Sequence, residues 1–106
     1  MGIVYLLVQI DGDGKELYKI GITKNSIETR LNCLKTGNPN TLRVLGSYKS
    51  GNYKKIESWL HRAYFNQRLN GEWFSLTSQQ VLSFEDECKS IDQTVSMLLE
   101  TNPFYN

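Results

Sequence analysis

Within the first 22 positions, the even-numbered residues of two segments, 4–10 and 18–22, are all apolar or aromatic. Ile3 to Ile10 is rich in Val, Ile and Leu, and it runs into Asp11-Gly12-Asp13-Gly14, a strong turn signal. Leu17 to Ile22 then returns, so the pattern predicts a β-hairpin. Its even positions form one core face on a period of two: Val4, Leu6, Val8, Ile10, Tyr18, Ile20 and Ile22.

The odd positions of the hairpin share its other face. If the loop holds an odd number of residues, Tyr5 lies opposite Lys19, and the two polar tips project together beside Gly21. A register slip of one residue would bury Lys19. The sequence therefore predicts that the Tyr5 hydroxyl and the Lys19 ammonium open onto the same side of the hairpin.

A helix is predicted after the hairpin, with Asn25 as its N-cap and Glu28 three residues later in a capping box. Its apolar stripe has the spacing i, i+4, i+7, and Arg30 borders that stripe. Arg30 can therefore lie over the edge of the sheet. The stripe consists of Ile27, Leu31 and Leu34, and the helix ends at Gly37 and Pro39.

The rest of the chain predicts a third strand and two further helices. The strand is Thr41 to Tyr48, with Leu42, Val44, Gly46 and Tyr48 on one face. A helix over 53–67 buries Ile56, Leu60 and Ala63, and it carries Glu57 and His61 as i, i+4 neighbours on an adjacent face. Thr77 with Gln80 begins a last helix, whose apolar residues are Val81, Phe84, Cys88, Ile91, Val95 and Leu98.

Charge divides the chain into two parts. Residues 1–70 carry eleven Lys or Arg against five Asp or Glu, whereas residues 71–106 carry one against six. Such asymmetry indicates that the first part meets a polyanion, although a solvated surface followed by an acidic final helix explains the counts equally well. Within the basic part, Lys24, Lys35, Arg43 and Lys54 are the candidate nucleic-acid contacts.

The 106 residues are enough for one domain with one core and too few for two. No apolar run approaches the roughly 20 residues that a membrane-spanning helix needs. We therefore expect a single domain over 1–106, with its motifs within 2–76 and an acidic helix over 77–106. The expected location is the cytoplasm of a bacterial or phage-infected host cell.

The order of several short motifs resembles the GIY-YIG nuclease superfamily. IVY at 3–5 stands where that family has GIY, KIG at 19–21 where it has YIG, Arg30 lies nine residues past Gly21, and Glu57 lies on a later helix. The chain is most similar to the phage-type branch, which includes proteins named after a phage T5 reading frame and has KIG in place of YIG. The shared pieces are KIGIT at 19–23, LKTGNP at 34–39, ESWLH at 57–61 and GEWF at 71–74, so the resemblance covers residues 2–76.

The resemblance implies an α/β (α+β) fold, with a small central antiparallel sheet of three strands flanked by helices. It also implies cleavage of DNA phosphodiester bonds that depends on Mg²⁺ or Mn²⁺. Tyr5 matches the tyrosine that activates water, Arg30 the arginine that stabilises the phosphate, and Glu57 the glutamate that holds the cation. Lys19 replaces the second tyrosine of most relatives, which leaves open whether Tyr5 or Lys19 takes the proton. Leu34 stands where many nucleases have His or Tyr, and His61 is the candidate for that missing polar group.

The residue types suit this chemistry. A carboxylate is a hard ligand for Mg²⁺, a guanidinium matches phosphate oxygens, and a nearby cation favours a tyrosine phenolate. Each residue also has a structural alternative, such as an Arg30–Glu57 ion pair or a Glu57–His61 pair on the helix surface. The alternative function is a catalytically silent module of the same fold that binds nucleic acid or docks a partner.

Overall fold

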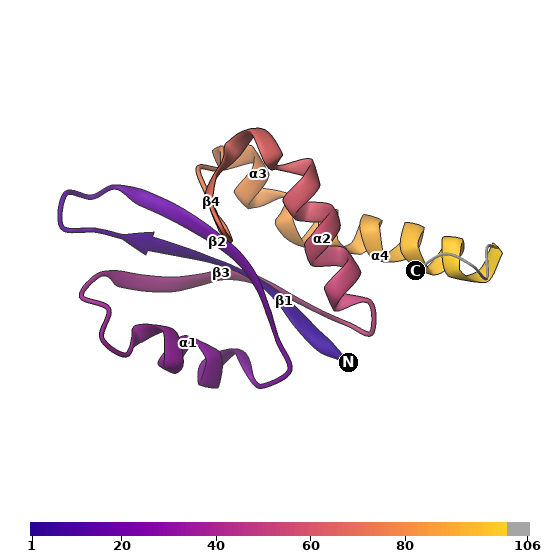
Figure 1. The fold of residues 1–106 in the computed structure, drawn as a ribbon, viewed down its shortest axis with the longest axis horizontal. Helices are drawn as coiled ribbons and strands as arrows, with labels where there is room; N and C mark the ends of the chain where they lie inside the picture. Colours follow the sequence, from indigo (N-terminus) through magenta and orange to yellow (C-terminus); the bar gives the residue numbers. More distant parts are fainter. Residues whose placement is uncertain (102–106) are drawn as a thin grey trace.

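The fold is an antiparallel sheet with helices on both faces (Figure 1). It was obtained as a computed structural model that describes residues 1–101. The elements are β1 (Gly2–Ile10), β2 (Glu16–Thr23), α1 (Ile27–Lys35), β3 (Thr41–Ser50), α2 (Tyr53–Ala63), the 3₁₀ turn η1 (Phe65–Gln67), β4 (Arg68–Asn70), β5 (Trp73–Phe74), α3 (Ser78–Leu82) and α4 (Phe84–Thr101). Residues 102–106 of the predicted acidic helix lie outside the described residues.

The sheet has five strands in the order β3-β1-β2-β5-β4, so the prediction of three strands is wrong. The two additional strands, β4 and β5, are only three and two residues long. Strands this short show no alternation of apolar and polar residues, so periodicity alone does not predict them. Gly71 connects them with a φ of 54°, which glycine adopts at no steric cost.

The hairpin register differs from the prediction by two residues. Tyr5 pairs with Gly21, and Leu7 pairs with Lys19. The cause is a longer turn, in which the Asp11 carboxylate accepts hydrogen bonds from the backbone N–H groups of Asp13 and Lys15, each at 2.9 Å. Because the shift is an even number, Tyr5 and Lys19 still share one face of the sheet, as the sequence predicts.

A β-bulge in β3 overturns the prediction that its apolar residues share one face. The register with β1 shifts between Leu6 and Leu7, which pair with Gly46 and Val44. Leu45 is the extra residue. Leu42 and Val44 therefore face α1, whereas Gly46 and Tyr48 face α2.

Two clusters of buried side chains lie on the two faces of the sheet. The cluster under α1 is small: Tyr5, Leu7 and Leu42, with the half-buried Ile27, Leu31, Leu34 and Trp73 against it. The cluster under α2 and α4 comprises Val4, Leu6, Ile20, Tyr53, Ile56, Leu60, Tyr64, Phe74, Leu76, Phe84, Cys88, Ile91 and Val95. Within α2, Ala63 is exposed rather than buried as predicted, and Tyr53 takes part in the core instead.

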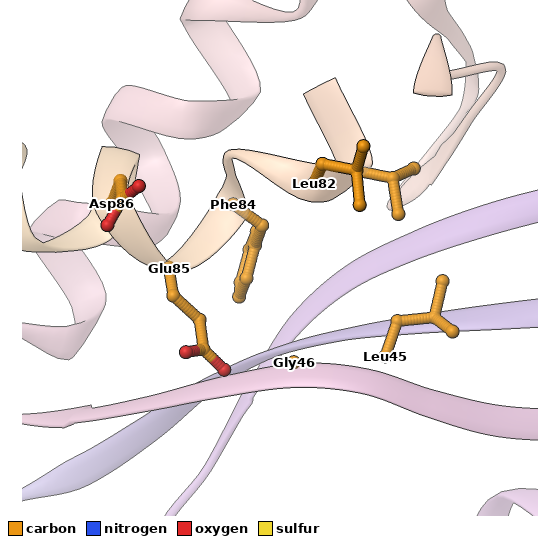
Figure 2. Close-up of a pocket in the computed structure, with 7 residues that line it drawn as sticks. Leu45, Gly46, Leu82, Phe84, Glu85 and Asp86 are labelled. Carbon is orange, nitrogen blue, oxygen red and sulfur yellow. The ribbon is translucent and has the colours of Figure 1, made fainter. Parts of the chain in front are cut away.

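The C-terminal segment is broken into two helices, not one as predicted. Thr77 and Gln80 form the predicted capping box at the start of α3. Ser83 separates α3 from α4, and its hydroxyl donates a hydrogen bond to the Gln79 carbonyl at 2.9 Å. Figure 2 shows Phe84 and Glu85 descending from the start of α4 toward Gly46 on β3. A Cβ at position 46 would lie 3.1 Å from the Phe84 ring, so the glycine lets α4 approach the sheet closely.

Asp92 fixes α4 to the end of β3 and the start of α2. Its carboxylate accepts hydrogen bonds from the Tyr48 hydroxyl (2.8 Å), the Ser50 hydroxyl (3.0 Å) and the Asn52 amide (2.9 Å). Burial would raise the pKa of Asp92, but these hydrogen bonds outweigh burial and lower it. The acidic helix thus orients α2, which carries Glu57 and His61.

Candidate functional site

Tyr5, Gly21 and Arg30 meet on the α1 face of the sheet. The Tyr5 side chain is completely buried, and its hydroxyl lies so close to Gly21 that a Cβ at position 21 would collide with it. Arg30 reaches this hydroxyl from α1, and its Nε donates a hydrogen bond to the Tyr5 oxygen at 3.3 Å. The N-cap of α1 is Ser26, whose Oγ accepts a hydrogen bond from the Thr29 N–H, rather than Asn25 as predicted.

The environment of Tyr5 pulls its pKa in two directions. Burial raises the pKa of Tyr5, and the charges of Glu72 and Glu57 raise it further. The hydrogen bond and the positive charge of Arg30 lower it, but the net pKa stays above the ordinary value. The cation that contacts the Tyr5 hydroxyl is thus Arg30, and not Lys19, which the sequence predicts to lie opposite Tyr5.

Lys19 is held by two groups on the adjacent strand pair. Its Nζ lies 3.5 Å from the Glu72 carboxylate and 5.6 Å from the centre of the Trp73 ring. Trp73 pairs with Lys19 across β2 and β5, which places the indole on the Tyr5 face of the sheet. The Lys19 side chain is only 12% exposed, so the ammonium lies in the wall of the site and not in bulk solvent.

Glu57 extends the candidate site to the helix α2. It comes from the opposite face, on α2, and one of its carboxylate oxygens, Oε2, is buried without a hydrogen-bond partner. Burial raises the pKa of Glu57 to about 7, with further contributions from the charge of Glu72 and from a hydrogen bond with it, while Lys19 lowers it. Glu57 is half-buried and is therefore not part of a pair with His61 on the helix surface, the structural alternative that the spacing allowed.

These carboxyl groups fit a divalent cation. An unpartnered buried oxygen beside a second carboxyl group is costly unless a proton or a cation lies between them. Among residues 1–101, no three His, Cys, Asp or Glu side chains are placed to share a metal ion. A cation at this site would therefore depend on Glu57, with water completing its coordination.

His61 lies one turn after Glu57 and contacts the backbone of β2. Its Nε2 donates to the Ile20 carbonyl oxygen at 3.0 Å, and its ring packs edge-on against Phe74 with the ring centres 5.0 Å apart. These contacts hold α2 next to Gly21. The structure thus gives His61 a place beside the site but ties its Nε2 to the backbone.

The four basic residues predicted to contact nucleic acid lie on different parts of the fold. Lys24 precedes α1 and Lys35 ends it, so both border the Tyr5 face. Arg43 pairs with Val8 and therefore faces α2. Lys54 begins α2, with its Nζ 5.9 Å from the centre of the Tyr53 ring. Lys24 and Lys35 thus flank the helix that carries Arg30, whereas Arg43 lies on the other face of the sheet.

Glu72 is the residue of the site that the sequence analysis missed. Its carboxylate pairs with Lys19, and its charge acts on Tyr5, Arg30 and Glu57. The sequence marks Glu72 only as part of the GEWF motif at 71–74, which by itself indicates no role for the glutamate. An acidic residue in a two-residue turn shows no pattern by which its partners can be found.

The fold and these contacts define an α+β domain with a Tyr-Arg-Glu-Lys site at the edge of its sheet. The chain belongs to the T5orf172 domain family, whose model matches residues 2–89. This family is associated with GIY-YIG-like and phage nuclease-type proteins. No curated protein and no solved structure matches the chain significantly. Within residues 1–101, no helix has the length and apolar character needed to cross a membrane.

Proposed function

We propose that the protein is a DNA endonuclease that depends on Mg²⁺ or Mn²⁺ and hydrolyses phosphodiester bonds. The observation that carries this proposal is the hydrogen bond from Arg30 to Tyr5, formed between residues 25 positions apart and next to the half-buried Glu57. A structural Arg30–Glu57 ion pair would have joined the two charges directly. Instead, Arg30 contacts a hydroxyl and Glu57 keeps a buried oxygen without a hydrogen-bond partner.

Each residue has a role that follows from its contacts. Glu57 holds the cation, and Arg30 binds the phosphate with the N–H groups that Tyr5 does not occupy. A bound divalent cation supplies positive charge that activates water and stabilises the phosphate. Tyr5 accepts the proton of the attacking water. The positive charge of a cation beside Glu57 and Glu72 would offset their negative charges, which are two of the three causes that raise the Tyr5 pKa. The charge of Arg30 would then favour the phenolate form of Tyr5.

The test is to incubate the full chain with supercoiled plasmid, branched DNA and RNA, with Mg²⁺, Mn²⁺ or a chelator. Cleavage of DNA should need the metal, and Glu57→Ala should lower it by at least about a hundredfold, the scale of losing one group that stabilises charge in a transition state. Glu16→Ala is the matched control, because Glu16 lies at the far end of the hairpin and pairs with Ile10. Undiminished cleavage by a folded Glu57→Ala variant would refute the assigned metal ligand.

The alternative function is a silent module that binds nucleic acid. The observation in its favour is Tyr5, which is completely buried and whose pKa is raised, so that it stays a protonated phenol and cannot accept a proton unless the site changes on binding. The same experiment separates the two functions. A wild-type chain that binds DNA but cuts no substrate with either metal would support the silent module and overturn the nuclease proposal.

A further inference from the structure

Glu72 is held in place by its backbone as well as by its side chain. Its carbonyl oxygen accepts a hydrogen bond from the Ile20 N–H at 3.2 Å, so the turn is tied to β2 next to Lys19. The preceding Gly71 has a positive φ, and its carbonyl accepts a hydrogen bond from Arg68 Nε at 2.7 Å. The β4–β5 turn therefore presents the Glu72 carboxylate at a fixed point of the site.

The Glu72 carboxylate pairs with Lys19, a long side chain that must be held in one position if its charge is to act at the site. A lysine loses rotamer entropy when it is ordered, and a single exposed ion pair seldom offsets that loss. Lys19 has two restraints, the Glu72 carboxylate and the Trp73 ring, and it is mostly buried between them. Glu72 is 41% exposed and can take part in this contact without itself being buried.

We propose that Glu72 is a positioning residue that acts through Lys19, holding its ammonium against Trp73 and beside Glu57. This inference rests on the proposed function, because Lys19 lies in the wall of the site to which the nuclease activity is assigned. Lys19 then contributes a fixed positive charge rather than a mobile one. Glu72 thereby joins the β4–β5 turn, which carries no predicted site residue, to the chemistry on β1, α1 and α2.

The first test does not depend on activity. In Glu72→Gln, which keeps the size of the side chain but removes its charge, NMR should show that the Lys19 side chain moves more freely than in the wild type, because only the Trp73 ring still restrains it. Glu16→Gln is the control and should leave Lys19 ordered. If Lys19 remains as ordered in a folded Glu72→Gln variant as in the wild type, Glu72 does not position it and the proposal is overturned.

The second test is a double-mutant cycle on DNA cleavage. We expect Glu72→Gln to lower kcat about tenfold with KM for DNA changed less than about twofold, and Lys19→Met to lower kcat further, by about a hundredfold. The double variant should match Lys19→Met, and Glu72→Asp should recover part of the loss. Losses that multiply would show that Glu72 acts independently of Lys19. A wild-type chain that cuts nothing would refute the proposed function, while the NMR test would still decide whether Glu72 positions Lys19.

Discussion

The two faces of the sheet differ in how many side chains they bury. The face under α2 and α4 buries thirteen residues in one cluster, and Asp92 ties its elements together with three hydrogen bonds. The face under α1 buries three residues, and α1 itself has no buried residue. Buried apolar area stabilises a fold roughly in proportion to its extent, so the first face supplies most of the stability.

The polar side chains of the candidate site lie mainly on the face with fewer buried residues. Tyr5, Arg30, Lys19 and Glu72 lie on or beside the thinly packed α1 face, and Glu57 reaches the same edge from α2. Elements with few buried apolar contacts open at low free energy, which suits a surface that must admit a ligand. The α2 face keeps β1 and β2 in register while the α1 face presents their polar side chains.

Matched truncations would test this comparison with the largest expected effect. Leu60→Ala removes a completely buried side chain under α2 and should lower the free energy of unfolding by about 2–5 kcal/mol. Leu31→Ala removes a half-buried side chain of α1 and should cost about 1 kcal/mol. Urea denaturation of both variants measures the difference. Equal losses would contradict the assignment of stability to the α2 face.

A second prediction concerns Gly21, which packs directly against the buried Tyr5 hydroxyl on the α1 face. Gly21→Ala places a methyl group against the buried Tyr5 hydroxyl, and because the ring has no free space it should cost about 1–3 kcal/mol. The Tyr5–Arg30 hydrogen bond should be lost as well, which NMR of the Arg30 Nε–H would detect. Gly12→Ala is the control, since a Cβ at that position meets nothing within 4 Å. A Gly21→Ala variant as stable as Gly12→Ala would show that Tyr5 is not confined.

Regular elements and the shared face of Tyr5 and Lys19 could be predicted from the sequence because they follow from periodicity. The alternation through Val4, Leu6 and Ile20 has period two, and the parity of the turn survives a register shift of two residues. The same reasoning could not fix the length of the turn, since it depends on hydrogen bonds that the Asp11 carboxylate accepts from backbone N–H groups. Nor could it predict the bulge at Leu45, which puts Val44 and Gly46 on opposite faces of the sheet.

The candidate site was predictable only in part, for a related reason. Tyr5, Arg30 and Glu57 were found from motif order, which fixes residue types but no contacts. The pairing of Lys19 with Glu72, and not with Tyr5, arises from strands of two and three residues that carry no periodic signal. Contacts made by short turns are therefore the part of the site that only the structure reveals.

The last and smallest expected effect concerns the contribution of Glu57 to stability as the pH changes. In the folded protein without metal, burial raises the pKa of Glu57 to about 7, whereas its ordinary value is 4.5. The folded state thus holds this proton more tightly than the unfolded state, so the stability that Glu57 contributes is complete below pH 4.5 and is lost as the pH rises through about 7. A carboxyl group so placed makes the site less stable near neutrality.

Glu57→Gln removes this dependence. Relative to the wild type, the variant should be more stable at pH 8 and no more stable at pH 4, with a gain of less than about 1 kcal/mol because water reaches about half of the side chain. Thermal melts at both pH values without metal would measure the difference, and Glu16→Gln, at the far end of the hairpin, should show no such change. A gain that is equal at both pH values would mean that Glu57 is not held in its protonated form by the fold. The metal-free site would then have to accommodate two ionised carboxylates side by side, with Lys19 as their shared partner.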